Sequence, residues 1–171
     1  MVHYLVLICL NFCFLGSYNN MAQSDEINYI HSKDIHVSSQ IRVGSSETTL
    51  KEAFGVSDSI IKFFDPLVDE VPMYYHFYGK SYFKIEANEI TAFEIIDNKF
   101  NLLGLKVGSP IKELEQKFPA SFSKKYSTSK NGNKVVRIGI ISDNGIKSDA
   151  FYIVFRVDSI NIVSIAYWEN P

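Results

Sequence analysis

"RVGSSETTLKEAF" (residues 42–54) has a close echo in "KVGSPIKELEQKF" (residues 106–118), which begins 64 residues later. Both share Val-Gly-Ser, then Leu, then Phe. Ser45 and Ser109 are suited to accept a hydrogen bond from the first turn of a helix. The Leu and the Phe in each stretch are four residues apart and so share one helix face. Each stretch therefore predicts a short helix that starts in the same way.

A second match follows each predicted helix. "SYFKIEANEITAFEI" (81–95) aligns with "IVFRVDSINIVSIAY" (153–167) at an offset of 72 residues. In both, a Phe, a basic, an aliphatic and an acidic residue follow one another, which is the period-2 alternation of a half-buried strand. Two matches in the same order favour an internal duplication over coincidence in an ordinary α+β domain.

Turn signals delimit the remaining strands. Asn131-Gly132 and Asn144-Gly145 are strong hairpin signals. The predicted strands are 59–64, 73–78, 81–87, 89–96, 122–127, 135–141, 150–157 and 161–168. The expected fold class is α+β, with two tandem repeats, each a helix plus a four-stranded antiparallel meander. Their bounds are 41–98 and 99–171, with an extended segment at 23–40 before them.

One such unit of about 65 residues has a marginal core, since a single helix covers only part of its sheet. Two units side by side could share a longer sheet, with the helices packed on one sheet face. The opposite face, here called the open face, would then stay uncovered.

The composition is that of a folded globular protein, with 46% hydrophobic and 21% charged residues. The net charge of −2 gives no basic excess, so a nucleic-acid partner is not expected. No Ser-His-Asp elbow, Gly-rich phosphate loop or HExxH motif is present. His31 and His36 are five residues apart, which suits no metal site. We expect no catalytic residues, no cofactor and no metal.

The N-terminus has the character of a signal peptide. Residues 1–21 contain no Asp, Glu, Lys or Arg, and residues 4–15 are apolar except for Asn11, a run too short to span a bilayer. We expect a signal peptide at 1–22, and a periplasmic or secreted location. A buried N-terminal element, or Met21 as the true start, are the alternatives. Cys9 and Cys13 both fall in this segment, so the mature chain would contain no disulfide.

The Val-Gly-Ser opening with its later Leu and Phe, followed by an antiparallel meander, resembles a known group. It is similar to the α+β repeat of the SmpA/OmlA (BamE) family of outer-membrane assembly lipoproteins, and to β-lactamase-inhibitor-protein-like modules with two such units in tandem. The resemblance covers about 41–168. It implies a non-catalytic envelope or secreted protein that binds another protein through an aromatic-rich sheet face. The chain lacks the Cys pairs of the inhibitor and a convincing lipobox, so membrane association is unsupported.

The open face carries the candidate binding residues. If Phe83 and Ile85 face the helices, alternation places these side chains on the open face: Tyr82, Lys84, Glu86, Ile90, Ala92, Glu94, Val154, Arg156, Asp158, Ile162, Ser164, Ala166 and Trp168. A three-residue loop at 79–81 would add Tyr74, His76 and Tyr78. A two-residue loop would instead point Tyr75 and Phe77 outward. The first alternative is preferred because it buries Phe77 rather than His76.

The predicted binding site is therefore Tyr74, His76, Tyr78, Tyr82, Lys84, Arg156 and Trp168. The expected function is an exported protein-binding module, an adaptor, assembly factor or inhibitor, whose partner is another envelope or secreted protein. A small-molecule or lipid-binding envelope protein is the alternative, and a hydrolase with a non-local site is a third. The sequence does not identify the partner or the oligomeric state.

Overall fold

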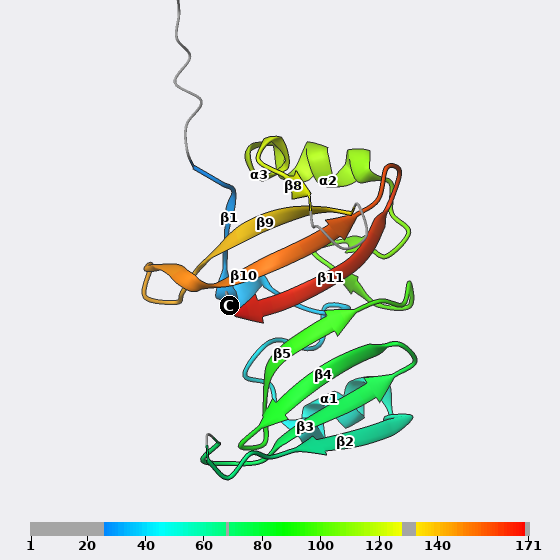
Figure 1. Ribbon diagram of the computed structural model, residues 1–171, viewed down its shortest axis with the longest axis vertical. Helices are drawn as coiled ribbons and strands as arrows, with labels where there is room; N and C mark the ends of the chain where they lie inside the picture. The colour runs from blue at the N-terminus through cyan, green and yellow to red at the C-terminus, as the bar shows by residue number, and fades with distance from the viewer. Residues whose placement is uncertain (1–25, 68, 128–132, 170–171) are drawn as a thin grey trace, which may run out of the picture.

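The computed structural model describes residues 26–67, 69–127 and 133–169 (Figure 1). The predicted signal peptide at 1–22 lies outside the described residues. The helices are η1 (Ser32–Asp34), α1 (Glu47–Phe54), α2 (Ile111–Lys117) and α3 (Pro119–Ser123). The strands are β1 (Tyr29–His31), β2 (Ser59–Phe63), β3 (Met73–Tyr78), β4 (Ser81–Glu86), β5 (Glu89–Ile95), β6 (Asn101–Leu102), β7 (Leu105–Lys106), β8 (Tyr126–Ser127), β9 (Lys134–Ile141), β10 (Lys147–Val157) and β11 (Ile162–Glu169).

Nine of the described strands form one large sheet. Its order is β1-β9-β10-β11-β5-β4-β3-β2, with β8 paired to β9 outside this path. The strand pairs are antiparallel except for β1, which runs parallel to β9. The sheet is continuous through its centre because β5 pairs directly with β11, where Ile95 lies opposite Ile165 and Phe93 opposite Tyr167.

The expected architecture of two tandem helix-plus-meander repeats is wrong. The described residues are mostly strand, and they form one large mixed sheet with three short α-helices. The β5–β11 pairing and the added parallel strand β1 depend on contacts between distant segments, which local alternation does not encode. A small separate hairpin, β6–β7, also precedes α2, and the helical segment after it breaks between Lys117 and Pro119 into α2 and α3.

The Val-Gly-Ser motif forms a turn and not a helix cap. Ser45 and Ser109 each accept a hydrogen bond from the backbone three residues earlier, at 3.2 Å in both cases. Gly44 and Gly108 have φ of 85° and 88°, a left-handed conformation that glycine adopts without strain. The cap of α1 is Ser46, whose hydroxyl accepts from the Thr49 N–H at 3.1 Å. The cap of α2 is Pro110, which offers no side-chain bond.

The same turn attaches to the sheet at both places. The Ile90 N–H donates to the Ser45 carbonyl and the Ile162 N–H to the Ser109 carbonyl, each at 2.9 Å. Irregularities in the β4–β5 and β10–β11 registers lie beside Ile90 and Ile162. Both isoleucines are buried, so their expected place on the open face is also wrong. A bulge shifts the alternation by one residue, which turns these side chains into the core.

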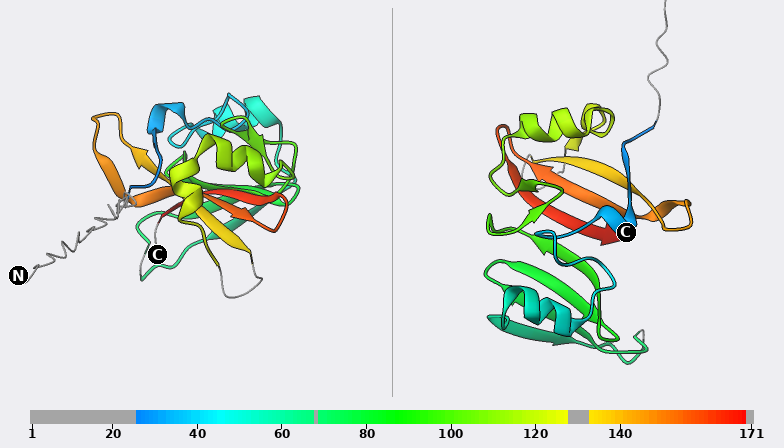
Figure 2. Two further views of the ribbon diagram at one scale, coloured as in Figure 1. Left: turned by 90° about the horizontal axis from the view of Figure 1, so that it is seen from above. Right: turned by 180° about the vertical axis from the view of Figure 1, so that it is seen from behind.

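The core lies between the sheet and the helices, on the face turned away from the viewer in Figure 1 (Figures 1 and 2). Leu50 of α1 and Leu114 of α2 are fully buried, as are Phe83, Phe93 and Phe155 of the sheet. The N-terminal segment around Val37 and Ile41 closes the same side. None of the described helices is long and apolar enough to cross a membrane.

Candidate protein-binding face

The open face is the sheet surface turned toward the viewer in Figure 1. Residues that pair directly across strands have side chains on the same face. One row over this face consists of Phe77, Tyr82, Glu94, Ala166, Val154 and Arg137. The next row consists of Ile61, Tyr75, Lys84 and Ala92. The two rows bring residues from both halves of the chain onto one surface.

Aromatic and aliphatic side chains gather at the β2–β4 end of this face. The ring centroids of Tyr75 and Tyr82 are 5.4 Å apart, and those of Phe77 and Tyr82 are 5.9 Å apart. Ile61 and Phe63 of β2 lie beside them and are 56% and 53% exposed. We call these five residues the apolar cluster. Ile61 and Phe63 are exposed and the three aromatic residues are half-buried, and such a group of large side chains on one surface is typical of a contact site.

Paired charges border the apolar cluster. The Arg156 guanidinium donates to the Glu94 carboxylate and, at 3.1 Å, to the Ser164 hydroxyl. On the neighbouring strand, the Lys84 ammonium lies 3.4 Å from the Glu86 carboxylate. The first pair lies across strands and the second within β4, and neither leaves a net charge on the face.

The phenol of Tyr82 is neutral at physiological pH. Burial, together with the Glu94 carboxylate and the Tyr75 phenol, raises the pKa of Tyr82 to about 12, and Arg156 opposes the rise only in part. A neutral phenol can both donate and accept a hydrogen bond. Tyr82 therefore offers an apolar ring and a polar tip at the border between the apolar cluster and the charged pairs.

The placement of Tyr74, His76 and Tyr78 on the open face is wrong. Tyr78 pairs directly with Ser81, so the β3–β4 turn has two residues, Gly79 and Lys80. That register turns the three side chains toward the helices and sends Tyr75 and Phe77 outward. The sequence is compatible with both the two-residue and the three-residue turn, and the two differ in which side chains face outward.

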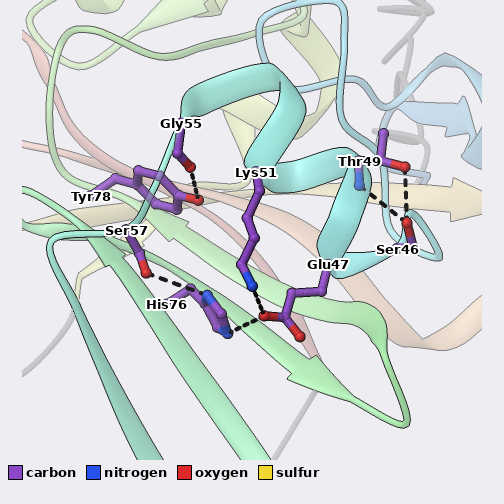
Figure 3. Close-up of polar contacts among 8 residues, drawn as sticks. All are labelled: Ser46, Glu47, Thr49, Lys51, Gly55, Ser57, His76 and Tyr78. Atoms are coloured by element: carbon purple, nitrogen blue, oxygen red, sulfur yellow. Dashed lines mark hydrogen bonds and ion pairs between the residues drawn. The ribbon is translucent and has the colours of Figure 1, made fainter.

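His76 is buried despite its polarity because α1 and the segment after it each supply a polar partner (Figure 3). Its Nδ1 atom lies 3.5 Å from the Ser57 hydroxyl, and its Nε2 atom lies 3.6 Å from the Glu47 carboxylate. The Glu47 carboxylate is 2.5 Å from the Lys51 ammonium, one helical turn later. A buried imidazole with polar neighbours on both nitrogens needs no exposure to water.

Tyr78 and Tyr74 also belong to the helix side. Tyr78 is 3% exposed, packs edge-on against Phe54 and Phe83, and donates its hydroxyl to the Gly55 carbonyl at 3.1 Å (Figure 3). Tyr74 is partly buried against the core. These residues hold α1 on the sheet.

The other predicted site residues have mixed outcomes. Tyr82, Lys84 and Arg156 lie on the open face, and Tyr82 and Arg156 both contact the region around Glu94. The backbone of Trp168, in β11, pairs with that of Tyr152 in β10, but the Trp168 side chain lies outside the described part of the chain.

The Ser57, His76 and Glu47 group has the residue types of a hydrolytic triad but not its geometry. Proton transfer between such groups needs heavy-atom distances of about 2.6–3.2 Å, and both contacts of His76 are longer. Burial lowers the pKa of His76, with the Glu47 carboxylate opposing and Lys51 assisting. We interpret the group as a structural attachment of α1.

Two further observations concern ligands. Within residues 26–67, 69–127 and 133–169, no group of three or more His, Cys, Asp or Glu side chains could hold a metal ion. An open hollow of about 340 Å³ lies on the helix side of the chain, between the N-terminal segment and the β6–β7 hairpin. It is lined by Asp34, His36, Ser39, Asn101, Leu103 and Gly104.

In comparisons with known proteins, no family model matches the chain, and no curated protein or solved structure has a significant match to it. The resemblance to the SmpA/OmlA family and to inhibitor-like modules therefore stays an expectation from the sequence.

Proposed function

We propose that the chain is an exported, non-catalytic module that binds another envelope or secreted protein through its open face. The apolar cluster is the observation that carries the proposal. Tyr75, Phe77 and Tyr82 meet beside the exposed Ile61 and Phe63 on a face that no described helix covers. Aromatic anchors surrounded by polar groups are the usual anatomy of a protein interface. The export part rests on the mostly apolar residues 4–15.

The paired charges beside the cluster give the interface its polar border. Each charge has an opposite partner, Arg156 with Glu94 and Lys84 with Glu86. A partner protein can therefore cover these side chains without burying an unpaired charge. Such a border contributes more to specificity and to the association rate than to affinity. The partner we expect offers aliphatic side chains to the cluster and neutral polar groups to its border.

A pull-down from envelope extract with the tagged chain as bait tests this proposal. The variant Tyr75→Ser with Phe77→Ser removes two anchors from the open face. A control, Ile146→Ser with Ile160→Ser, removes two apolar side chains, 64% and 66% exposed, from turns in the other half of the sheet. We expect a stoichiometric partner with the wild type and the control and none with the cluster variant, at unchanged far-UV circular dichroism. Equal capture by all three proteins would contradict the proposal.

Small-molecule or lipid binding is the second candidate, and the hollow beside the β6–β7 hairpin is the observation that favours it. Native mass spectrometry of the purified chain would detect a retained adduct. Asn101→Leu should remove the adduct if this hollow holds it, whereas the cluster variant should not.

A further inference from the structure

We propose that two copies of the chain associate through β2, by antiparallel pairing across a two-fold axis at Ile60. β2 ends the sheet, and its only strand neighbour within the described residues is β3 (Figure 1). All five of its residues are exposed. The outer edge of such a strand presents unpaired N–H and C=O groups, which can form a ladder with another strand.

The two ends of the sheet differ in how they are protected. At the opposite end, β1 has three residues and runs directly into η1, so it offers little length for pairing. β2 has five residues and contains Ile60 and Ile61, which are 52% and 56% exposed. Natural edge strands are usually short, charged or covered. Lys62 is the single charged residue within β2.

The sequence of this edge is complementary to itself. In an antiparallel pair centred on Ile60, Ile60 faces Ile60 of the second copy, and Ser59 faces Ile61. The same register places Asp58 opposite Lys62 of the second copy, once on each side of the axis. Opposite charges directly across a strand pair stabilise it, and like charges destabilise it. A register centred on Lys62 would bring two ammonium groups together, which disfavours it.

Asp58 is held alongside β3, directly before β2. Its N–H donates to the Phe77 carbonyl at 2.8 Å, and its carboxylate accepts from the Gly79 N–H, so Asp58 already lies alongside β3. Lys62 lies on the same side of β2 as Asp58 by alternation, 6.0 Å from the centre of the Tyr74 ring. The charges that must meet across the axis therefore share one face.

A dimer of this kind would extend the sheet without a break. The apolar cluster of each copy borders β2, so the two clusters would lie next to each other across the axis. One short strand pair buries less than the roughly 1,200 Å² of a stable interface, so we expect a weak, concentration-dependent dimer. The inference is independent of the proposed function, since it needs β2 and no third protein.

Sedimentation velocity of the full chain over a range of concentrations tests the dimer. We expect a monomer–dimer equilibrium that Lys62→Glu weakens about tenfold or more, because Glu would face Asp58. Adding Asp58→Asn to that variant removes the repulsion but keeps an acceptor for the Gly79 N–H, and we expect it to recover most of the lost affinity. Lys112→Glu, which makes the same charge change at an exposed position of α2, is the matched control and should leave the dimer unchanged. A wild-type chain that stays monomeric throughout would overturn the proposal.

Cross-linking tests the register without depending on the charges. With Cys9 and Cys13 replaced by Ser, Ile60→Cys should form a disulfide-linked dimer under mild oxidation, since residues at the axis bring their Cβ atoms within bonding range. Ile61→Cys alone should not, but it should cross-link to Ser59→Cys when the two variants are mixed. A dimer that cross-links at Ile61 and not at Ile60 would overturn the Ile60 axis. Circular dichroism of each variant shows whether it is folded.

Discussion

The Asp97 carboxylate accepts a hydrogen bond from the Lys80 N–H at 2.7 Å, and this contact holds the turn that determines which side chains reach the open face. The same carboxylate oxygen accepts from the N–H and the hydroxyl of Ser81, each at 3.0 Å. The three bonds fasten the two-residue β3–β4 turn to the end of β5. Tyr75 and Phe77 are consequently outside and His76 and Tyr78 inside.

Removal of this carboxylate should destabilise the protein. Asp97→Ala leaves the N–H groups of Lys80 and Ser81 without their acceptor, and we expect a loss of about 1–3 kcal/mol in the free energy of unfolding. Chemical denaturation measures it. Asp149→Ala, which removes an exposed carboxylate in β10, should change the value by less than about 0.5 kcal/mol. Equal effects of the two substitutions would show that Asp97 does not hold the turn.

The contribution of Asp97 should disappear in acid. Burial by itself would raise the pKa of Asp97, but the hydrogen bonds from Lys80 and Ser81 and the charge of Lys99 outweigh it and hold the pKa below 3.8. A lowered pKa stabilises the folded state fully above the unfolded-state pKa, and this gain is lost as the pH falls through the folded-state value. The difference in Tm between the wild type and Asp97→Asn should therefore shrink below about pH 4. A difference that is constant from pH 7 to 3 would contradict this account.

Substitution of the inward-facing Tyr78 should destabilise the protein more than substitution of the outward-facing Tyr75. Tyr78→Ser empties a buried site and should cost about 3–5 kcal/mol, whereas Tyr78→Phe loses only the bond to the Gly55 carbonyl, about 1 kcal/mol. Tyr75→Ser removes a partly exposed ring and should also cost about 1 kcal/mol. Urea denaturation compares the three. A larger loss for Tyr75→Ser than for Tyr78→Ser would contradict the register of β3.

His76 should make the protein less stable in mild acid. Burial lowers the pKa of His76 below 6.5, and the Glu47 carboxylate opposes the change only in part. The unfolded chain then takes up the proton first as the pH falls below about 6.5, so the free energy of unfolding decreases until the folded-state pKa is passed. His76→Gln should remove this part of the pH dependence between pH 7 and 5. A slope that His76→Gln leaves unchanged would contradict this account.

Gly139 should tolerate no larger residue while Tyr29 is present. A Cβ atom at position 139 would lie 2.4 Å from a ring carbon of Tyr29, so Gly139→Ala must displace β1 or β9. We expect a cost of about 1–3 kcal/mol. Combining it with Tyr29→Ala should recover most of that cost, and a double-mutant cycle measures the coupling. Additive effects would show that the ring and the glycine do not meet.

Much of the local structure was predictable from short-range patterns. The alternation in Phe83, Lys84 and Ile85 predicted which of them are buried, and the structure confirms that Phe83 and Ile85 are in the core. The predicted limits of the strand at 73–78 agree with β3. These features depend on side-chain alternation and turn chemistry within a few residues, both of which are visible in the sequence.

The binding residues were less predictable because a single residue of turn length reverses a face. Two-residue and three-residue loops at Gly79 both fit the sequence, and the three-residue loop that we preferred, because it buries Phe77 rather than His76, is wrong. The deciding partner, Asp97, is 17 residues from Lys80, and the partners that allow His76 to be buried come from α1 and the segment after it. The apolar cluster follows from that register.

By itself, the sequence determined the alternation and the limits of strands such as β3 and β4, because these depend on backbone sterics and on neighbouring side chains. The strand predicted at 122–127 is wrong, since α3 continues to Ser123 and only Tyr126–Ser127 form a strand, β8. The predicted turn at Asn131-Gly132 lies outside the described residues. Only the tertiary structure decided that β5 pairs with β11 to make one sheet, that Ile90 and Ile162 turn inward, and that Tyr75 and Phe77 face out. Each of these depends on hydrogen bonds between residues far apart in the chain. A period-2 pattern is compatible with either face, and only such long-range bonds select one.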